Sequence, residues 1–123
     1  MNGETSLWKK QAEEDLKTAE TNLKQKIYYA AAFFAHQSAE KILKAVCIKK
    51  FKELIKVHDL VFLARKADAT GEIVNGCRFL NKAYIEARYP SDIRTPSDVF
   101  SKEDAEKCIS IAKGVYQWAE AKL

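Results

Sequence analysis

Apolar side chains recur at intervals of three and four residues along most of the chain, and no strand-like alternation persists. A repeat of this kind is typical of helices that bury one face and leave the other in water. It predicts an all-α protein, built as a single up-and-down helical bundle of about five helices. One domain would cover residues 1–123, with helices over about residues 4–24, 27–51, 57–69, 73–88 and 101–122.

Local signals indicate where these helices begin and end. Thr5 or Ser6 is suited to cap the first helix, and Gly71 is suited to end the third. The run "SKED" at residues 101–104 has the pattern of a capping box at the start of the last helix. Tyr89 precedes a proline and should therefore leave helical geometry, which opens a longer loop before the last helix.

The segment over residues 27–51 is the predicted centre of the bundle. Its first half is apolar nearly all round, as expected of a helix that is covered on every side. Small and aromatic side chains from Ala30 to Phe33 favour a close approach of the neighbouring helices.

The net charge is mild at +4, but it is concentrated in one segment. Residues 40–66 contain eight Lys and Arg against three acids, a balance of +5 that leaves about −1 for the rest of the chain. A solvated helix face followed by an exposed turn would account for this segment. The alternative is a surface that faces phosphates or an acidic partner.

Cysteine usage and hydropathy both favour a cytoplasmic protein. The three cysteines, Cys47, Cys77 and Cys108, are far apart in the sequence, and each falls on an apolar helical stripe. They predict buried free thiols rather than a disulfide framework or a zinc site. The first ten residues hold no apolar signal segment, and no apolar run approaches the length of a membrane span, so no membrane contact is expected.

Motifs of the common metalloenzymes and hydrolases are missing from the sequence. The two histidines, His36 and His58, lack metal-ligand spacing, and there is no glycine-rich phosphate loop or Gly-x-Ser-x-Gly elbow. We therefore expect no metal and no cofactor. His36 lies in an apolar stretch and is interpreted as a buried, hydrogen-bonded histidine. His58 either forms a first-turn polar pair with Asp59 or lies at the mouth of a groove.

Arg88 is the most informative single residue of the sequence. In the last turn of a helix, its charge would interact favourably with the carbonyl end of the helix dipole. It also lies one turn beyond Tyr84 on the inward line, where a guanidinium needs an anionic partner or a cleft. Glu40, Asp59 and Asp92 are the candidate partners, and both a structural and a ligand-facing role remain open.

Three segments resemble those of a known family in their sequence, their order and their spacing. They are "FFAHQSAEKILKAV" at residues 33–46, "HDLVFL" at 58–63 and "YIEARYPSD" at 84–92, and the opening "LWKKQAEEDLKTAE" fits as well. Together they resemble a HEPN domain, the helical domain named for higher eukaryotes and prokaryotes nucleotide-binding. The resemblance extends over nearly the whole chain.

The resemblance implies an up-and-down helical bundle that usually forms a homodimer and is involved with nucleotides or RNA. Many such proteins pair with a small separate nucleotidyltransferase, often in toxin–antitoxin arrangements. The toxic members are metal-independent ribonucleases that carry an Arg followed by a His after four to six intervening residues.

This ribonuclease motif is absent from the sequence. Arg88 matches the arginine of the motif, but the residues after it read "YPSDIRT" and contain no histidine. Arg88 could still stabilise the charge of a phosphorane. The general base would be missing unless His58 approached in space or from a partner subunit.

Three hypotheses follow. The preferred one is a nucleotide- or RNA-binding module without full ribonuclease activity, forming a homodimer or pairing with a nucleotidyltransferase. The others are a ribonuclease toxin with an altered active site, and a purely structural interaction subunit in which Arg88 is buried and salt-bridged. In the preferred hypothesis Arg88 contacts phosphate and Tyr89 stacks on a base. The full set of candidate binding residues is Arg88, Tyr89, His58, Asp59, Lys44 and Arg94.

Overall fold

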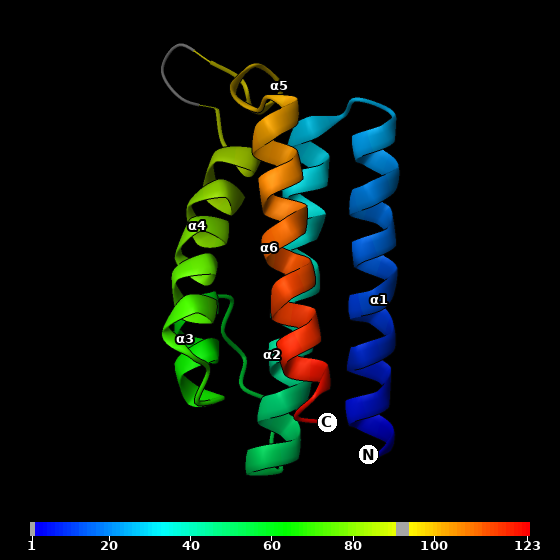
Figure 1. Cartoon of the computed structure of the whole chain (residues 1–123), viewed down its shortest axis with the longest axis vertical. Helices are drawn as coiled ribbons and strands as arrows, with labels where there is room; N and C mark the ends of the chain where they lie inside the picture. The colour runs from blue at the N-terminus through cyan, green and yellow to red at the C-terminus, as the bar shows by residue number, and fades with distance from the viewer. Residues whose placement is uncertain (1, 91–93) are drawn as a thin grey trace.

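The computed structural model describes residues 2–90 and 94–123, and within these ranges all regular secondary structure is helical (Figure 1). The all-α prediction is thereby confirmed, and a single-turn helix is added in the loop before the last helix. The six helices of the described residues are α1 (Gly3–Lys24), α2 (Tyr28–Phe51), α3 (Leu60–Lys66), α4 (Gly71–Arg88), α5 (Pro96–Val99) and α6 (Lys102–Glu120).

Four long helices run alternately up and down, and α2 lies at their centre. In Figure 1, α1 and α4 run in one direction while α2 and α6 run in the other. The predicted central position is confirmed, because α2 contacts each of the other helices that the structure describes. Ala31, Ala32, Ala35 and Ala39 are fully buried, so backbones approach closely at this centre.

Two helix-end predictions are confirmed. The Ser101 hydroxyl accepts from the Asp104 amide at 3.1 Å, and the Asp104 carboxylate accepts from the Ser101 amide at 3.0 Å, which completes the capping box. Tyr89 leaves the helix with φ −122° and ψ 133°, as its position before a proline requires.

Two other helix-end predictions are wrong. The cap of α1 is Asn2, whose side-chain oxygen accepts from the Thr5 amide at 2.8 Å, because an amide oxygen caps as well as a hydroxyl. The chain leaves α3 through Asp68, which adopts the left-handed conformation at φ 57°. Gly71 instead begins α4, behind an N-cap at Thr70.

The three cysteines are buried free thiols, as predicted. Burial raises the pKa of the Cys77 and Cys108 thiols to about 12, which makes both poor nucleophiles. None of the described helices has the length and apolar character needed to cross a membrane.

The packing of α4 on α6 depends on a glycine. A Cβ atom on Gly76 would lie 2.8 Å from Cγ2 of Ile111, whereas a Cβ on Gly114 would have no neighbouring atom within 4 Å. The close contact of α4 with α6 at Gly76 therefore requires a residue without a side chain. No packing contact requires a glycine at position 114.

These two glycines allow a matched test of the interface. Gly114→Ala should stabilise the protein by about 0.5–1 kcal/mol, because alanine is the better helix former. Gly76→Ala should be less stable than Gly114→Ala by about 1–3 kcal/mol, since the new methyl group displaces Ile111. Urea unfolding of both variants measures the difference, and equal stabilisation by both would contradict the tight contact.

Candidate functional site

Arg88 lies exposed on the surface of α4, although the sequence pattern placed it on the inward line. Successive residues of a helix are rotated by about 100°, so Arg88 is displaced from the buried Leu80 by about 80°, and Ala87 by only about 20°. Ala87 is buried accordingly. The inward prediction was wrong because repeated steps of four residues drift away from the core.

Two tyrosine rings hold the Arg88 guanidinium. Its Nη1 donates a hydrogen bond of 2.6 Å to the hydroxyl of Tyr84. The guanidinium carbon lies 4.8 Å from the Tyr84 ring centroid and 5.2 Å from the Tyr89 ring centroid. Cation–π contacts of this kind orient the arginine without neutralising its charge.

The proposed carboxylate partners of Arg88 are engaged elsewhere. Glu40 pairs with Lys44 and His58, and Asp59 caps α3. In the part of the chain that the structure describes, no acid forms an ion pair with Arg88. Asp92, the third candidate, lies outside the described residues. Arg88 is therefore not the buried residue that the structural-subunit hypothesis assumed.

Beneath Arg88, the Tyr84 ring covers part of α2. It stacks on the imidazole of His36 with ring centroids 3.8 Å apart, and on Phe33 with centroids 5.6 Å apart. The Tyr84 ring therefore lies between the surface arginine and the bundle interior, with its hydroxyl bonded to Arg88.

His36 is buried without the hydrogen bond that the sequence analysis expected. Only 1% of the residue is exposed, and neither ring nitrogen has a hydrogen-bond partner among the residues that the structure describes. The nearby Asn81 side chain donates one N–H to Asp59 at 2.8 Å and accepts from the Leu60 amide at 3.1 Å, and it lies close enough to His36 to raise the pKa of the imidazole against the larger effect of burial. Burial lowers the pKa of His36 to about 4 despite the opposing charge of Glu40, so the ring is neutral at pH 7.

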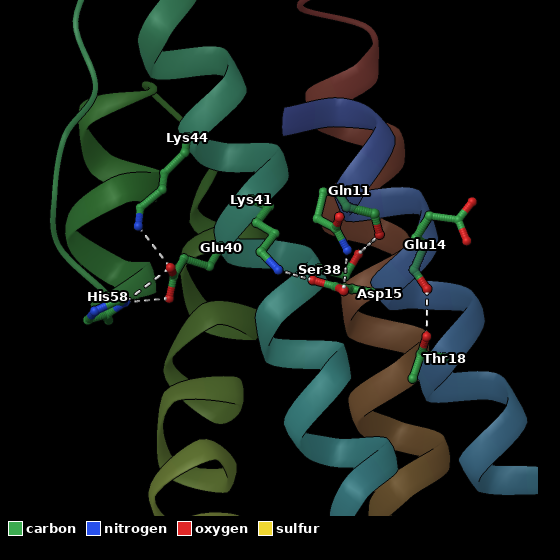
Figure 2. A network of polar contacts seen from close by, with 10 residues as sticks. Gln11, Glu14, Asp15, Thr18, Ser38, Glu40, Lys41, Lys44 and His58 are labelled. Carbon is green, nitrogen blue, oxygen red and sulfur yellow. Dashed lines mark hydrogen bonds and ion pairs between the residues drawn. The ribbon is translucent and has the colours of Figure 1, made fainter. Parts of the chain in front are cut away.

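One turn further along α2, Glu40 joins a buried lysine to an exposed histidine (Figure 2). Its carboxylate accepts from Lys44 Nζ at 2.8 Å, and both of its oxygens lie 3.1 Å from Nδ1 of His58. The Glu40 and Lys44 side chains are almost fully buried, whereas the His58 side chain is 75% exposed. With Nδ1 directed at the carboxylate, Nε2 is the nitrogen that remains for other partners.

The structure separates His58 from Asp59, so the polar pair, one of the two alternatives for His58, does not form. Asp59 is the N-cap of α3 and accepts from the amides of Val61 and Phe62 as well as from Asn81. Although partial burial opposes the effect, these hydrogen bonds lower the pKa of Asp59. The carboxylate is thus already occupied by donors of its own chain.

The predicted site residues consequently fall into different environments. Arg88 and Tyr89 lie together on the surface, and His58 lies exposed above Glu40. Lys44 is buried, with its ammonium on Glu40 and 5.6 Å from the Trp8 ring centroid, so it presents no charge at the surface. Arg94 is exposed on the connection that leads to α5.

The sequence analysis missed Tyr84, Asn81 and the role of Glu40 as an anchor for His58. The spacing of four residues between Glu40 and Lys44, and between Tyr84 and Arg88, was the available signal, because such pairs face one another on a helix. We refer to the whole group as the polar seam. It consists of His36, Glu40, His58, Asn81, Tyr84, Arg88 and Tyr89.

Within the described ranges, no group of three His, Cys, Asp or Glu side chains is placed to hold a metal ion. The chemistry that the polar seam can perform is that of a fixed guanidinium, exposed aromatic rings and an oriented imidazole.

Comparison with known proteins gives consistent matches. The model of the HEPN domain matches residues 5–122. The crystal structure of TT1696 from Thermus thermophilus has a TM-score of 0.93 at 25% identity, covering 99% of this chain and 100% of that one. ST0689, an archaeal HEPN homologue, has a TM-score of 0.82 at 28% identity, covering 98% of each chain. A Methanocaldococcus jannaschii protein named "Putative toxin MJ1304" is 27% identical, covering 90% of this chain and 82% of that protein.

Because His36 is buried in its neutral form, we expect the free energy of unfolding to decrease as the pH falls below about 6.5. The pKa of His36 is about 4 in the folded state and near 6.5 when unfolded, so the unfolded state binds the proton more readily between these values. The stability that the neutral ring contributes is complete above pH 6.5 and decreases as the pH falls toward 4. Between pH 7 and 5, wild type should lose about 2 kcal/mol more than His36→Phe, which keeps a ring against Tyr84. Urea unfolding at both pH values tests this, and equal losses would contradict it.

Proposed function

The chain belongs to the HEPN domain family, and from this premise we propose that it is a toxin–antitoxin-type module that binds nucleotides or RNA at its polar seam. The observation that carries the proposal is the surface position of Arg88, held by Tyr84 and Tyr89 without a described acidic partner. An exposed guanidinium in a fixed orientation is suited to a bidentate contact with phosphate.

The neighbouring rings support a nucleotide rather than a simple anion. Tyr89 is 58% exposed and lies against the guanidinium, so a base could stack on the tyrosine while Arg88 contacts its phosphate. His58 is a further exposed polar group of the polar seam. Lys44 is not part of this proposal, because its charge is neutralised by Glu40 below the surface.

The toxin–antitoxin assignment is supported by the family and by the name of the Methanocaldococcus jannaschii relative. A toxin of this kind needs a partner that restrains it. We propose a small nucleotidyltransferase as that partner, and a homodimer as the assembly of the chain itself.

A second candidate function is metal-independent cleavage of RNA, and the His58–Glu40 pair favours it. Buried Glu40 fixes the orientation of His58, so Nε2 could accept the proton of a 2′-hydroxyl as a general base. His58 and Arg88 both lie within electrostatic reach of His36. In this function Arg88 would stabilise the phosphorane.

The binding proposal is tested with labelled single-stranded RNA in EDTA. Arg88→Ala should weaken binding at least tenfold, because a charged hydrogen bond to phosphate is lost. Its unfolding free energy should fall by less than about 1 kcal/mol, since the side chain is exposed. Arg78→Ala, at an exposed arginine of the same helix, is the control for the lost charge. Equal affinities of wild type and Arg88→Ala, or equal losses in both variants, would contradict the polar seam as the site.

The cleavage candidate is tested by the products formed in the same samples. Wild type should produce 2′,3′-cyclic phosphate ends, and His58→Gln should reduce the rate at least a hundredfold while melting normally, because the ring is exposed. Cleavage that persists in His58→Gln would exclude this histidine as the base. If wild type binds RNA without cleaving it, the cleavage candidate is excluded and the binding function is retained.

A further inference from the structure

A second cationic and aromatic surface lies where α2 and α3 end. Figure 1 shows the end of α2 near the two chain termini, at the opposite end of the bundle from the end of α4 that carries Arg88. The two helix ends are joined there, because Lys50 Nζ forms a hydrogen bond of 3.4 Å with the Lys66 carbonyl and an ion pair with Asp68. We call this region the α2–α3 end surface. Its residues are Lys50, Phe51, Phe62, Arg65 and Lys66.

A lysine lies between two exposed phenylalanine rings on this surface. Lys66 Nζ is 5.9 Å from the Phe51 ring centroid and 5.7 Å from the Phe62 ring centroid. Lys50 Nζ approaches the Phe51 ring to 5.4 Å. The two rings are 40% and 42% exposed, although large apolar side chains elsewhere on these helices form the core.

Local structure explains only part of this arrangement. A lysine at a helix C-terminus interacts favourably with the last carbonyl groups, which accounts for Lys50. The same effect accounts for Arg65 and Lys66 in the last turn of α3, but it does not account for the two exposed phenylalanines beside them. Phe62, Arg65 and Lys66 also border a hollow of about 390 Å³, whose lining includes Val61 and Asp59.

We propose that the α2–α3 end surface binds single-stranded nucleic acid. Phe51 and Phe62 would stack on bases, while Lys66 and Arg65 would contact the phosphates between them. The acids at its edge do not repel the strand strongly, because Asp68 is paired with Lys50 and Asp59 accepts three hydrogen bonds. The surface lies away from Arg88, and the proposal does not depend on the polar seam.

Nucleic acid fits this surface better than an acidic protein does. The centres of protein interfaces are depleted of lysine, whereas nonspecific binding of single strands combines cations with the faces of aromatic rings. On the α2–α3 end surface Lys66 lies between the two rings and Arg65 is exposed beside them, and exposed Lys52 and Lys56 follow in the adjoining connection. Part of the positive charge of residues 40–66 is therefore exposed at or next to this surface.

The test uses a labelled twelve-nucleotide oligo(dT) and the matching oligo(U), titrated by fluorescence anisotropy at several salt concentrations. Phe62→Ala should weaken binding of both at least fivefold, because one stacking contact is lost. Lys66→Gln should weaken both and reduce the salt slope by about 0.7, the value of one phosphate contact on a single strand.

Two control variants match these changes. Lys17→Gln removes the same charge at an exposed position of α1, and Leu7→Ala truncates an exposed apolar side chain of the same helix. Both should bind within twofold of wild type. Circular dichroism at the assay temperature should show that all four variants remain folded.

The outcomes separate this proposal from the polar seam. Binding that Arg88→Ala weakens but Phe62→Ala and Lys66→Gln leave unchanged would overturn the α2–α3 end surface and leave the proposed function intact. If Phe62→Ala and Lys66→Gln lose oligonucleotide affinity while Arg88→Ala keeps it in full, the α2–α3 end surface is supported as a binding site independent of the polar seam. Absence of oligonucleotide binding, with Phe62-dependent binding of a labelled polyglutamate peptide, would overturn nucleic acid in favour of an acidic protein.

Discussion

The burial of α2 on all sides is the constraint on which the rest of this structure depends. A polar group inside such a bundle is costly unless it finds a partner, and α2 carries several. Ser38 donates to the Ala12 carbonyl at 2.8 Å, Lys41 pairs with Asp15 of α1, and Glu40 pairs with Lys44 (Figure 2). The first two contacts orient α2 against α1, and the Glu40 carboxylate also holds His58 of the connection to α3.

The polar seam is a consequence of the same constraint on the other side of α2. Glu40 holds the exposed His58 from below, while His36 stays neutral and unpartnered under the Tyr84 ring. The tyrosine in turn carries Arg88 at the surface. Buried Glu40 thus supports an imidazole at the surface, and the Tyr84 ring above His36 supports a guanidinium.

The polar seam and the α2–α3 end surface differ in their physical character. In the polar seam, hydrogen bonds and ring contacts fix the orientation of Arg88, which suits recognition of a defined phosphate. At the α2–α3 end surface, the long side chain of Lys66 lies over phenylalanine rings, which have no hydroxyl group that could fix its orientation by a hydrogen bond. That arrangement suits contacts that tolerate any sequence.

The periodicity of apolar residues by itself determined the helices, the central place of α2 and the buried thiols, because burial of a helical stripe is a local property of the chain. The capping box at Ser101 and the break at Tyr89 were equally local. Only the tertiary structure decided that Lys44 is buried, that His58 turns to Glu40 instead of Asp59, and that Arg88 is exposed. Each of these depends on the rotation of a helix about its axis or on residues far apart in the chain, which a repeat of three and four residues does not specify.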